Sequence, residues 1–412
     1  MIKQSAEART ASLSFRHLKL FESIGRLKSV RRASDECNLS QPAVTQALSK
    51  LEDQVGVQLM ERRASGSYLN PHGDILYART VRFFDQVEEA LVELAVPGGQ
   101  AGARTIGKRI SRSQIRSLIG ICENGSFAQA AEALGVSQAS LQRSARDLES
   151  NLRRSIFYRT AAGIMVTPAG IEFGRRMKLA IQEIESGLQE IEAAQGVLGS
   201  QILIGAMPFG GSVLLASVLD EFIHAYPNAD LRIANENSAD MLQSLRDGDV
   251  DFVIGLLPST PSADLVSEAL AETPYSIVAR RGHALLSKGK VTVEDLRDYD
   301  WVVGTNGSSR RACFERLFAK SEAPQAPIAT CALPIIRHLL ARSDRLTLMT
   351  SYELMHEEDL AAISFGTIAP VPAIGITMRA NWLPTQLHRD FIALLRARTA
   401  RPVVRRTLRA AS

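Results

Sequence analysis

The chain lacks the features that mark membrane proteins, secreted proteins and most metal-binding proteins. No stretch of its 412 residues approaches the roughly 20 consecutive apolar residues of a membrane-spanning helix. Its four cysteines are far apart and form neither a CxxC nor a His/Cys metal motif. The N-terminal segment lacks a signal peptide's apolar core, and cysteine usage suits a reducing compartment. We therefore expect a cytoplasmic protein without metal or membrane contact; a redox pair of Cys313 and Cys331 stays an alternative.

The sequence also has no recognisable catalytic or nucleotide-binding motif. It contains neither a Walker A loop nor a G-x-G-x-x-G loop, and its seven histidines have no acid–base partner by spacing. Ser212 lacks the G-x-S-x-G elbow of a hydrolase nucleophile. We therefore predict no enzyme activity and no bound cofactor. Turnover lost on changing Ser212 or Arg310 would favour the alternative of an enzyme.

What the chain does contain is a duplicated segment. Phe15–Gly73 matches Arg112–Gly170 without a gap, ninety-seven residues further along. The identical pairs include Ser29/Ser126, Ala33/Ala130, Ser40/Ser137, Gln41/Gln138, Leu51/Leu148, Glu52/Glu149, Arg62/Arg159, Gly66/Gly163, Pro71/Pro168 and Gly73/Gly170. A repeat of this length predicts two copies of one structural unit.

Each copy predicts two helices joined by a short turn. In the second copy, Ser126 can cap a helix that Gly135 ends, and Ser137 can cap the next helix. The first copy has Ser40 as the equivalent cap and Pro42 in the first turn, where proline is tolerated. This is the helix-turn-helix arrangement, and two short strands around a glycine predict a wing after it. Two copies in one register argue against a merely structural helix pair.

The second helix of each copy begins with small and polar side chains, which suit the major groove of DNA. Arginines of the wing are expected to meet phosphate. The predicted DNA-binding residues are Ser40, Gln41, Pro42, Thr45, Gln46, Ser49, Arg62 and Arg63 in the first copy, and Ser137, Gln138, Ser140, Gln142, Arg143, Arg146 and Arg159 in the second.

Both copies resemble the winged helix-turn-helix of LysR-type transcriptional regulators. The run "AA-x-x-L-x-(V/L)-S-Q-(P/S)-A-(V/L)-S" of that family is similar to Ala33–Val44 and Ala130–Leu141. The family's "(L/V)-T-P-A-G" matches Val166–Gly170. The resemblance implies an atypical member with two tandem N-terminal units.

The two copies depart from the family's pattern at different places. The first has Asn70 and His72 where the family favours Thr and Ala. The second has Arg153-Arg154 where the first has Gly56-Val57, which leaves open the turn after its second helix. The second unit could therefore read DNA, or serve as an oligomerisation or interaction module.

Charge is spread unevenly along the chain. Residues 1–197 carry 26 Lys/Arg and 21 Asp/Glu, whereas residues 198–395 carry 16 and 23. Residues 396–412 carry six arginines and no acidic residue, and we predict a basic disordered tail there. Positive charge on the duplicated units suits a surface that binds phosphate.

A long amphipathic helix is predicted after each copy, over Asp74–Val96 and Ile171–Val197. Pro97-Gly98-Gly99 predicts a break after the first. The family resemblance implies that such a helix forms the dimer contact. The two helices could instead pair within one chain, or each could pack on its own winged unit.

From residue 200 the pattern changes to strands alternating with helices, which indicates an α/β sheet. Predicted strands are Gln201–Met207, Ala229–Ala234, Val250–Leu257, Tyr275–Ala279, Trp301–Val303, Arg345–Thr350 and Ile374–Met378, and Asn381–Arg396 is the predicted last helix. Gly248–Gly255, Glu272–Leu285 and Val291–Val302 resemble the effector-binding domain of the same family, built like a periplasmic solute-binding protein.

Ligands of such folds bind in the crevice between two subdomains, where helix N-termini favour anions. The predicted effector-binding residues are Phe209, Gly210, Gly211, Ser212, Asn237, Leu256, Pro258, Thr305, Ser308, Ser309 and Arg310.

The sequence thus predicts a multidomain protein of the α+β and α/β classes, with two winged helix-turn-helix units, their linker helices, and a two-subdomain effector domain. The expected segments are 14–73 and 111–170 for the winged units, 74–97 and 171–197 for the linker helices, 200–395 for the effector domain and 396–412 for the tail. We predict a sequence-specific transcriptional regulator controlled by a small-molecule effector, with anions as the expected class. An α/β enzyme with accessory DNA binding is the alternative. Its expected partners are double-stranded DNA, further copies in a homodimer or homotetramer, and RNA polymerase.

Overall fold

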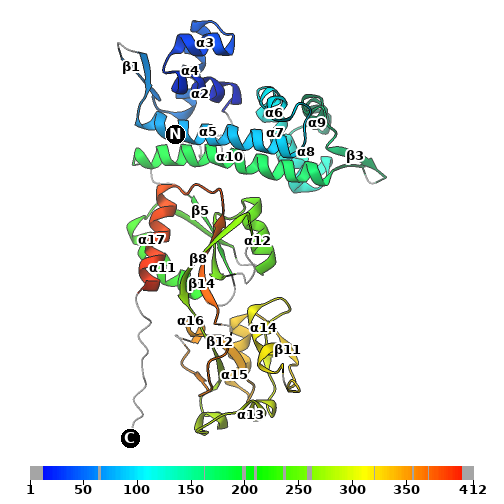
Figure 1. The fold of residues 1–412 in the computed structure, drawn as a ribbon, viewed down its shortest axis with the longest axis vertical. Helices are drawn as coiled ribbons and strands as arrows, with labels where there is room; N and C mark the ends of the chain where they lie inside the picture. Colours follow the sequence, from blue (N-terminus) through cyan, green and yellow to red (C-terminus); the bar gives the residue numbers. More distant parts are fainter. Residues whose placement is uncertain are drawn as a thin grey trace. The chain divides into compact units, whose positions relative to one another are not determined.

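The computed structural model describes residues 13–63, 66–161, 163–196, 201–207, 211–234, 238–257, 262–319, 321–354, 357–369 and 371–400. The chain divides into two compact units, Met1–Ser200 (unit 1) and Gln201–Ser412 (unit 2) (Figure 1). The predicted fold class is confirmed, because unit 1 holds two winged helix-turn-helix groups and unit 2 is an α/β domain. None of the described helices is long and apolar enough to cross a membrane.

Unit 1 repeats one order of elements twice. The first copy consists of α2 (Phe15–Leu27), α3 (Val30–Cys37), α4 (Gln41–Val55), β1 (Met60–Arg63), β2 (Gly66–Leu69) and α5 (Pro71–Glu93). The second consists of α7 (Arg112–Asn124), α8 (Phe127–Leu134), α9 (Gln138–Leu152), β3 (Phe157–Thr160), β4 (Gly163–Val166) and α10 (Pro168–Ala194). Each strand pair is an antiparallel hairpin.

The predicted serine caps are confirmed in both copies. Ser40 Oγ accepts a hydrogen bond from the backbone N–H of Ala43 at 3.4 Å, and Ser137 Oγ accepts one from Ser140 at 3.2 Å. Ser126 caps α8 in the same way. These bonds satisfy backbone donors that a helix leaves free in its first turn, and so they fix where α4, α8 and α9 begin.

The turn after α9 has the same conformation as the turn after α4, although the residues differ. Gly56 ends α4 with φ 84°, and Arg153 ends α9 with φ 52°, both in the left-handed region. In each case the backbone N–H of the cap donates to the carbonyl of the equivalent glutamate, Glu52 or Glu149. The replacement of Gly56 by Arg153 therefore keeps the turn, at the cost of a left-handed conformation for a residue with a Cβ.

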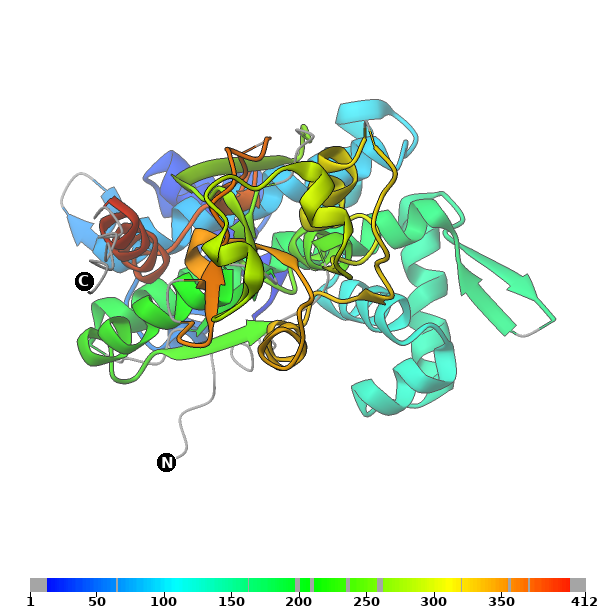
Figure 2. The same cartoon turned by 90° about the horizontal axis from the view of Figure 1, so that it is seen from below.

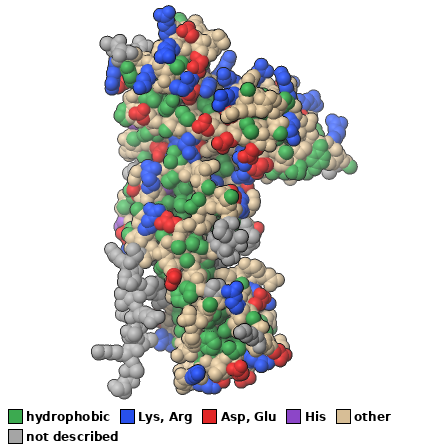
Figure 3. Space-filling view, in the orientation of Figure 1, with side chains coloured by type: hydrophobic (Ala, Val, Ile, Leu, Met, Phe, Trp, Pro, Cys, Tyr) green, Lys and Arg blue, Asp and Glu red, His purple; other side chains and the backbone are tan. Residues whose placement is uncertain are grey.

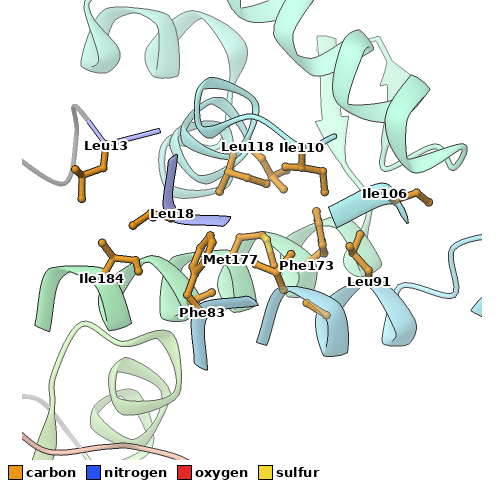
Figure 4. Packing of buried hydrophobic residues seen from close by; sticks show 14 of the residues in the cluster. Leu13, Leu18, Phe83, Leu91, Ile106, Ile110, Leu118, Phe173, Met177 and Ile184 are labelled. Atoms are coloured by element: carbon orange, nitrogen blue, oxygen red, sulfur yellow. The ribbon is translucent and has the colours of Figure 1, made fainter. Parts of the chain in front are cut away.

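One hydrophobic core joins both copies and both long helices (Figure 4). Phe83 of α5 and Met177 and Ile184 of α10 are each about 1% exposed within it, together with Leu18 and Leu118 from the two copies. The long helices run antiparallel, since Arg79 bonds to Glu190 while Arg176 pairs with Glu93. The pairing that the sequence left open is therefore within one chain.

The segment between the copies holds a helix that the sequence analysis did not predict. Gly98 and Gly99 take positive φ angles of 89° and 54°, which makes the predicted break after α5. The chain then forms α6 (Gly99–Gly107), whose Ala103 and Ile106 are buried against the common core.

Unit 2 is built on a five-stranded sheet in the order β6-β5-β7-β14-β8. Strand β5 is parallel to β6 and β7, whereas β14 is antiparallel to β7 and β8. Its elements are β5 (Gln201–Ala206), α11 (Gly211–Ala225), β6 (Asp230–Ala234), α12 (Ser238–Asp247), β7 (Phe252–Leu256), β8 (Leu265–Glu272), β14 (Ala373–Arg379) and α17 (Gln386–Ala400). Strand β8 was not predicted, because its apolar residues do not alternate with polar ones, as they do in a strand with one buried face.

The chain leaves this sheet after β8, builds a second subdomain and returns at β14. The second subdomain has an antiparallel sheet in the order β12-β9-β13 and a parallel pair of β10 and β11. Its elements are β9 (Tyr275–Arg280), η1 (Ala284–Ser287), α13 (Val293–Arg297), β10 (Val302–Val303), α14 (Ser309–Leu317), β11 (Ile328–Ala329), α15 (Leu333–Ala341), β12 (Thr347–Thr350), α16 (Ser351–Leu354) and β13 (Leu360–Ala362). The subdomains have separate hydrophobic cores.

The predicted boundary of the basic tail is wrong by several residues. Helix α17 continues to Ala400, beyond the predicted end of the last helix at residue 396. Arg396 donates to Glu268 at 2.7 Å and Arg398 donates to Glu221, so both arginines belong to the folded domain. Ion pairs with acidic residues far away in sequence keep this end of the helix in place, and residues 401–412 lie outside the described part of the chain.

Candidate nucleic-acid interface

Helix α4 presents one polar face and buries the other. Val44 and Leu51 are fully buried, whereas the predicted DNA-binding residues Gln41, Gln46 and Ser49 are exposed. The other predicted residues of this helix, Ser40, Pro42 and Thr45, are exposed as well. The helical spacing of the buried residues therefore turns the polar start of the helix outward, as a major-groove helix requires.

Helix α9 repeats this division at equivalent positions. Leu141 and Leu148 are buried, and the exposed predicted residues are Ser137, Gln138, Ser140, Arg143 and Arg146. Gln142 departs from the prediction, because it is half-buried and lines a hollow of about 190 Å³ between α9 and the β3–β4 hairpin. We expect it to contribute less to an exposed contact surface than its neighbours.

A glutamate in each copy, buried in the case of Glu52 and half-buried in the case of Glu149, connects the wing to the second helix of the helix-turn-helix. Glu52 Oε1 accepts from the backbone N–H of Leu59 at 2.8 Å, and Glu149 Oε1 accepts from that of Ile156 at 2.8 Å. In the sequence these glutamates are recognisable only as an identical pair of the repeat. Their role became visible because the strand that follows each helix brings its first N–H groups to the carboxylate.

The wings carry the predicted arginines in an exposed position. Arg63 is exposed, pairs with Glu61 and lies 5.2 Å from the centre of the Tyr68 ring. Arg159 is exposed on the β3–β4 hairpin, which projects from the helices α7–α9 (Figure 2). The side chain of Arg62 lies outside the described residues.

Positive charge gathers over the two winged groups (Figure 3). Among the residues that the structure describes, Arg143 and Arg146 make no ion pair with an acidic side chain, so their charge is available to phosphate. The first copy adds Lys50, also exposed. Burial, with the charges of Lys50 and Arg16, lowers the pKa of His17 below its usual value.

In unit 2 the structure describes only part of the predicted effector site. Phe209, Gly210, Asn237 and Pro258 lie outside the described residues, and the side chains of Gly211 and Ser212 are not described. Leu256 is half-buried at the end of β7, and Thr305 is exposed. Of the predicted effector residues on the first subdomain, Leu256 alone therefore has a described side chain.

The predicted effector residues of the second subdomain lie at the start of α14 and in the loop before it. Ser308 caps this helix by accepting from Arg311 N–H at 3.2 Å, and Ser309 Oγ lies 2.8 Å from the hydroxyl of Tyr275. Burial raises the pKa of Tyr275 to about 12, so this hydroxyl keeps its proton.

Arg310 corrects the prediction of an open binding residue. Its side chain is fully buried and pairs with Glu353 at 2.6 Å, which also accepts from the backbone N–H of Thr350 at 2.7 Å. Arg310 therefore joins α14 to α16 inside the subdomain, and Glu353 in turn holds the end of β12.

All four cysteines are free thiols. Cys313 is 2% exposed, and burial raises its pKa to about 11. Cys331 Sγ lies 3.2 Å from Thr305 Oγ1. A protonated, buried Cys313 is a poor nucleophile, which argues against the alternative of a redox pair.

Two family models match this chain. The model "LysR substrate binding domain" matches residues 195–400, and "Bacterial regulatory helix-turn-helix protein, lysR family" matches residues 15–74 and again residues 113–171. The chain belongs to the LysR family of transcriptional regulators. The helix-turn-helix matches fall on the two copies that the structure shows in unit 1, and the substrate-binding match falls on unit 2.

Curated relatives of the regulator are themselves transcriptional regulators. GalR of Pseudomonas putida is 29% identical over 389 residues, which cover 92% of this chain and 96% of GalR. PcaQ of Agrobacterium fabrum is 24% identical over 291 residues, which cover 68% of this chain and 92% of PcaQ. Among solved structures, a full-length OxyR variant from Pseudomonas aeruginosa shares the fold, with a TM-score of 0.52 at 20% identity over 71% of this chain and 95% of that chain.

These matches establish a DNA-binding transcriptional regulator with a small-molecule effector domain, in a family of regulators rather than of enzymes. The expected function is thereby confirmed at the level of the family.

Proposed function

We propose that both winged units of this LysR-type regulator read double-stranded DNA, under the control of an effector bound between the subdomains of unit 2. The observation that supports two readers is the equivalence of the exposed faces. Gln41 and Gln138 occupy the same place in the first turn of α4 and α9, and both are exposed. The alignment with GalR also extends across both copies, since it takes in 92% of this chain.

The exposed residues divide into base readers and phosphate contacts by their chemistry. A glutamine at the start of a recognition helix can bond to adenine in two places, which discriminates by about 1–3 kcal/mol against another base. Arg143 and Arg146 can reach guanine or phosphate, and Arg63 and Arg159 on the wings suit phosphate. The other exposed residues predicted to bind DNA in α4 and α9 lie beside these and complete the proposed DNA-binding surface of each copy.

A footprint on the protein's own promoter region tests the two-reader proposal. We expect Gln41→Ala and Gln138→Ala each to weaken the footprint, by roughly 5- to 150-fold in affinity. Gln325→Ala is the matched control, because Gln325 is an exposed glutamine of unit 2. A footprint that Gln138→Ala leaves unchanged would make the second unit an interaction module instead.

The effector is proposed to bind at the crevice between the two subdomains of unit 2. Helix α14 begins there with the exposed Ser309, whose hydroxyl shares one hydrogen bond with that of Tyr275 and leaves one O–H of the pair to donate to a small anionic ligand. Thr305 and Ser308 lie in the preceding loop, and the buried ion pair of Arg310 with Glu353 holds the start of the helix in place. Calorimetric titration with a panel of small carboxylates tests this, and Ser309→Ala is expected to weaken binding roughly tenfold.

We further propose that the regulator works as a homodimer or homotetramer and contacts RNA polymerase when it regulates transcription. An effector that binds two arrangements of unit 2 unequally would shift the relation between DNA-binding units. Light scattering of the purified protein with and without operator DNA measures the assembly, and a monomer under both conditions would contradict this part of the proposal.

A further inference from the structure

Two of the ion pairs between α5 and α10 are related by symmetry. Arg79 of α5 donates from Nε to Glu190 of α10 at 2.9 Å, and Arg176 of α10 pairs with Glu93 of α5 at 2.5 Å. The repeat makes Arg176 the equivalent of Arg79 and Glu190 the equivalent of Glu93. Each contact therefore has a mate in which the two copies exchange roles, which is the property of an interface with two-fold symmetry.

The axis of this symmetry passes where equivalent residues meet each other. Gln86 and Glu183 occupy the same position in the repeat, and Gln86 Nε2 donates to Glu183 Oε1 at 3.0 Å. A residue touches its own equivalent only on the two-fold axis of an isologous pair. The pseudo-two-fold axis that relates α5 to α10 therefore passes close to this contact.

We propose that unit 1 is an internal pseudo-two-fold dimer, so that a single chain supplies both readers of a two-part DNA site. The DNA part of this inference rests on the proposed function of the two winged units. A three-helix group lies toward each end of the antiparallel helix pair, with β1 near one end and β3 near the other (Figure 1). One rigid helix pair thus holds two readers that other dimers would bring together from two chains.

The residues at the axis favour pairing of unlike copies over pairing of like ones. Glu183 accepts from Arg79 Nη1 at 2.9 Å and from Arg82 Nη2 at 2.9 Å, and the side chains of Arg79 and Glu183 are 2% and 7% exposed. The equivalent of Arg82 in the second copy is Leu179. Two α10 helices from separate chains would place Glu183 against Glu183 without Arg82 beside them.

Two α5 helices from separate chains would meet the opposite difficulty. They would place Gln86 against Gln86, and no carboxylate at the axis would face Arg79 and Arg82. Each like pair would carry an excess of one charge. Two α10 helices would bring two Arg176 to two Glu183 and two Glu190, whereas two α5 helices would bring two Arg79 and two Arg82 to two Glu93. A buried excess of one charge is costly in either case. The differences between the copies at positions 82/179 and 86/183 therefore select the unlike pair.

The two readers differ in chemistry, so the site that they read is expected to be asymmetric. The first presents Gln41, Thr45 and Gln46, whereas the second presents Gln138, Arg143 and Arg146. A dimer of identical readers selects an inverted repeat, because the symmetry of the protein is copied in the DNA. A pseudo-dimer of unlike readers selects two dissimilar half-sites in a fixed order.

A disulfide across the helix pair tests whether the pairing is within one chain. A Cβ built on Gly187 would lie 3.2 Å from the Cβ of Arg79, a few tenths of an ångström below the range of about 3.5–4.5 Å for a disulfide, so a small shift of the helices would bring the two thiols into place. After oxidation of the full-length double variant Arg79→Cys with Gly187→Cys, we expect a monomer on a non-reducing gel and the 79–187 bond in peptide masses. Each single substitution is the control for bonds with native cysteines. A covalent dimer through the same bond would overturn the proposal, because α5 would then pair with α10 of another chain.

Selection of binding sites from a random double-stranded library tests the reader arrangement, again with the full-length chain. We expect one or more copies of an element with two dissimilar halves. Gln41→Ala should relax base preference in one half and Gln138→Ala in the other, each by roughly 5- to 150-fold in affinity. An inverted repeat in which Gln41→Ala relaxes both halves equally would overturn the inference.

The two experiments also separate this inference from the proposed function. If no sequence were enriched over random DNA, DNA reading by the two units would fail, whereas a 79–187 bond within one chain would still establish the internal dimer. If a two-part site were selected but the bond joined two chains, the units would read DNA and the internal dimer would be wrong.

Discussion

The exchange of Glu183 for glutamine removes one charge from the centre of unit 1 and keeps the shape of the side chain. Glu183 accepts hydrogen bonds from Arg79, Arg82 and Gln86 at 2.9–3.0 Å, and its side chain is 7% exposed. Breaking a buried ion pair by removing one partner costs about 3–5 kcal/mol. Arg79 keeps Glu190, and Arg82 is 32% exposed and can turn to water. We therefore expect Glu183→Gln to lower the free energy of unfolding of unit 1 by about 3 kcal/mol, at the lower end of that range.

The two units can be followed separately during unfolding by urea. Both tryptophans, Trp301 and Trp382, belong to unit 2, so tryptophan fluorescence follows the unfolding of unit 2. Most of the helical residues belong to unit 1, so far-ultraviolet circular dichroism follows mainly the unfolding of unit 1. Glu183→Gln should lower the midpoint of the dichroism transition by about 1–2 M, for a slope of about 2 kcal/mol per molar urea. The midpoint of the tryptophan fluorescence transition should not move.

The matched control is Glu172→Gln, the same exchange on the same helix. Glu172 is 46% exposed and pairs with Arg175 and Arg176, so its loss should cost about 0.5 kcal/mol or less. A dichroism midpoint for Glu183→Gln that equals the control, or a fluorescence midpoint that falls by the same amount, would refute the assignment of Glu183 as the centre of the helix pair.

Three further outcomes follow from local geometry. Gly73→Ala should destabilise unit 1 by about 3 kcal/mol in the same dichroism assay, because the new Cβ would lie 2.0 Å from the carbonyl oxygen of Leu59. Gly289→Ala is the control and should be nearly neutral, because no atom lies within 4 Å of its new Cβ. Arg153→Gly should stabilise unit 1 by about 0.5–1 kcal/mol. A residue with a Cβ in the left-handed region costs roughly 1–2 kcal/mol, and glycine removes this cost but loses more backbone entropy on folding. An unchanged or lower urea midpoint would contradict this expectation. Burial and the charges of Lys50 and Arg16 lower the pKa of His17, so the unfolded chain takes up the proton first. The stability of unit 1 should therefore be fully present above pH 6.5 and fall as the pH drops below it, and His17→Gln should remove that part of the slope.

The predicted parts of the fold depend on rules that act over a few residues. Ser40, Ser137 and Gly135 mark helix ends by caps that bond to the nearest turn, so their sequence positions are sufficient to locate α4, α8 and α9. The alternation of strands and helices after residue 200 predicts an α/β domain in the same way. Strand β8 was missed because it is held by pairing with β14, more than a hundred residues later, and has little apolar pattern of its own.

The candidate DNA surface was predicted better than the candidate effector site. The polar face of a recognition helix follows from helical spacing alone, and of the described residues in that set only Gln142 is not exposed. An effector site is assembled from loops of two subdomains, and loop sequences carry no periodic signal. Arg310 shows the difficulty: its place in the sequence suits a ligand contact, but the fold brings Glu353 to it inside the core.

The sequence by itself determined that unit 1 contains two copies of a winged helix-turn-helix, because duplication, caps and turns are written in local residues. Only the tertiary structure decided how the copies are joined. An apolar stripe on a long helix can pack against many partners, so the stripes of α5 and α10 did not by themselves predict which helix each one packs against. The choice depends on Arg79, which meets Glu183 and Glu190 more than a hundred residues away, and on the contact of Gln86 with its own equivalent. Such contacts exist only once the chain has folded back on itself, which is why the pairing within one chain is a property of the structure.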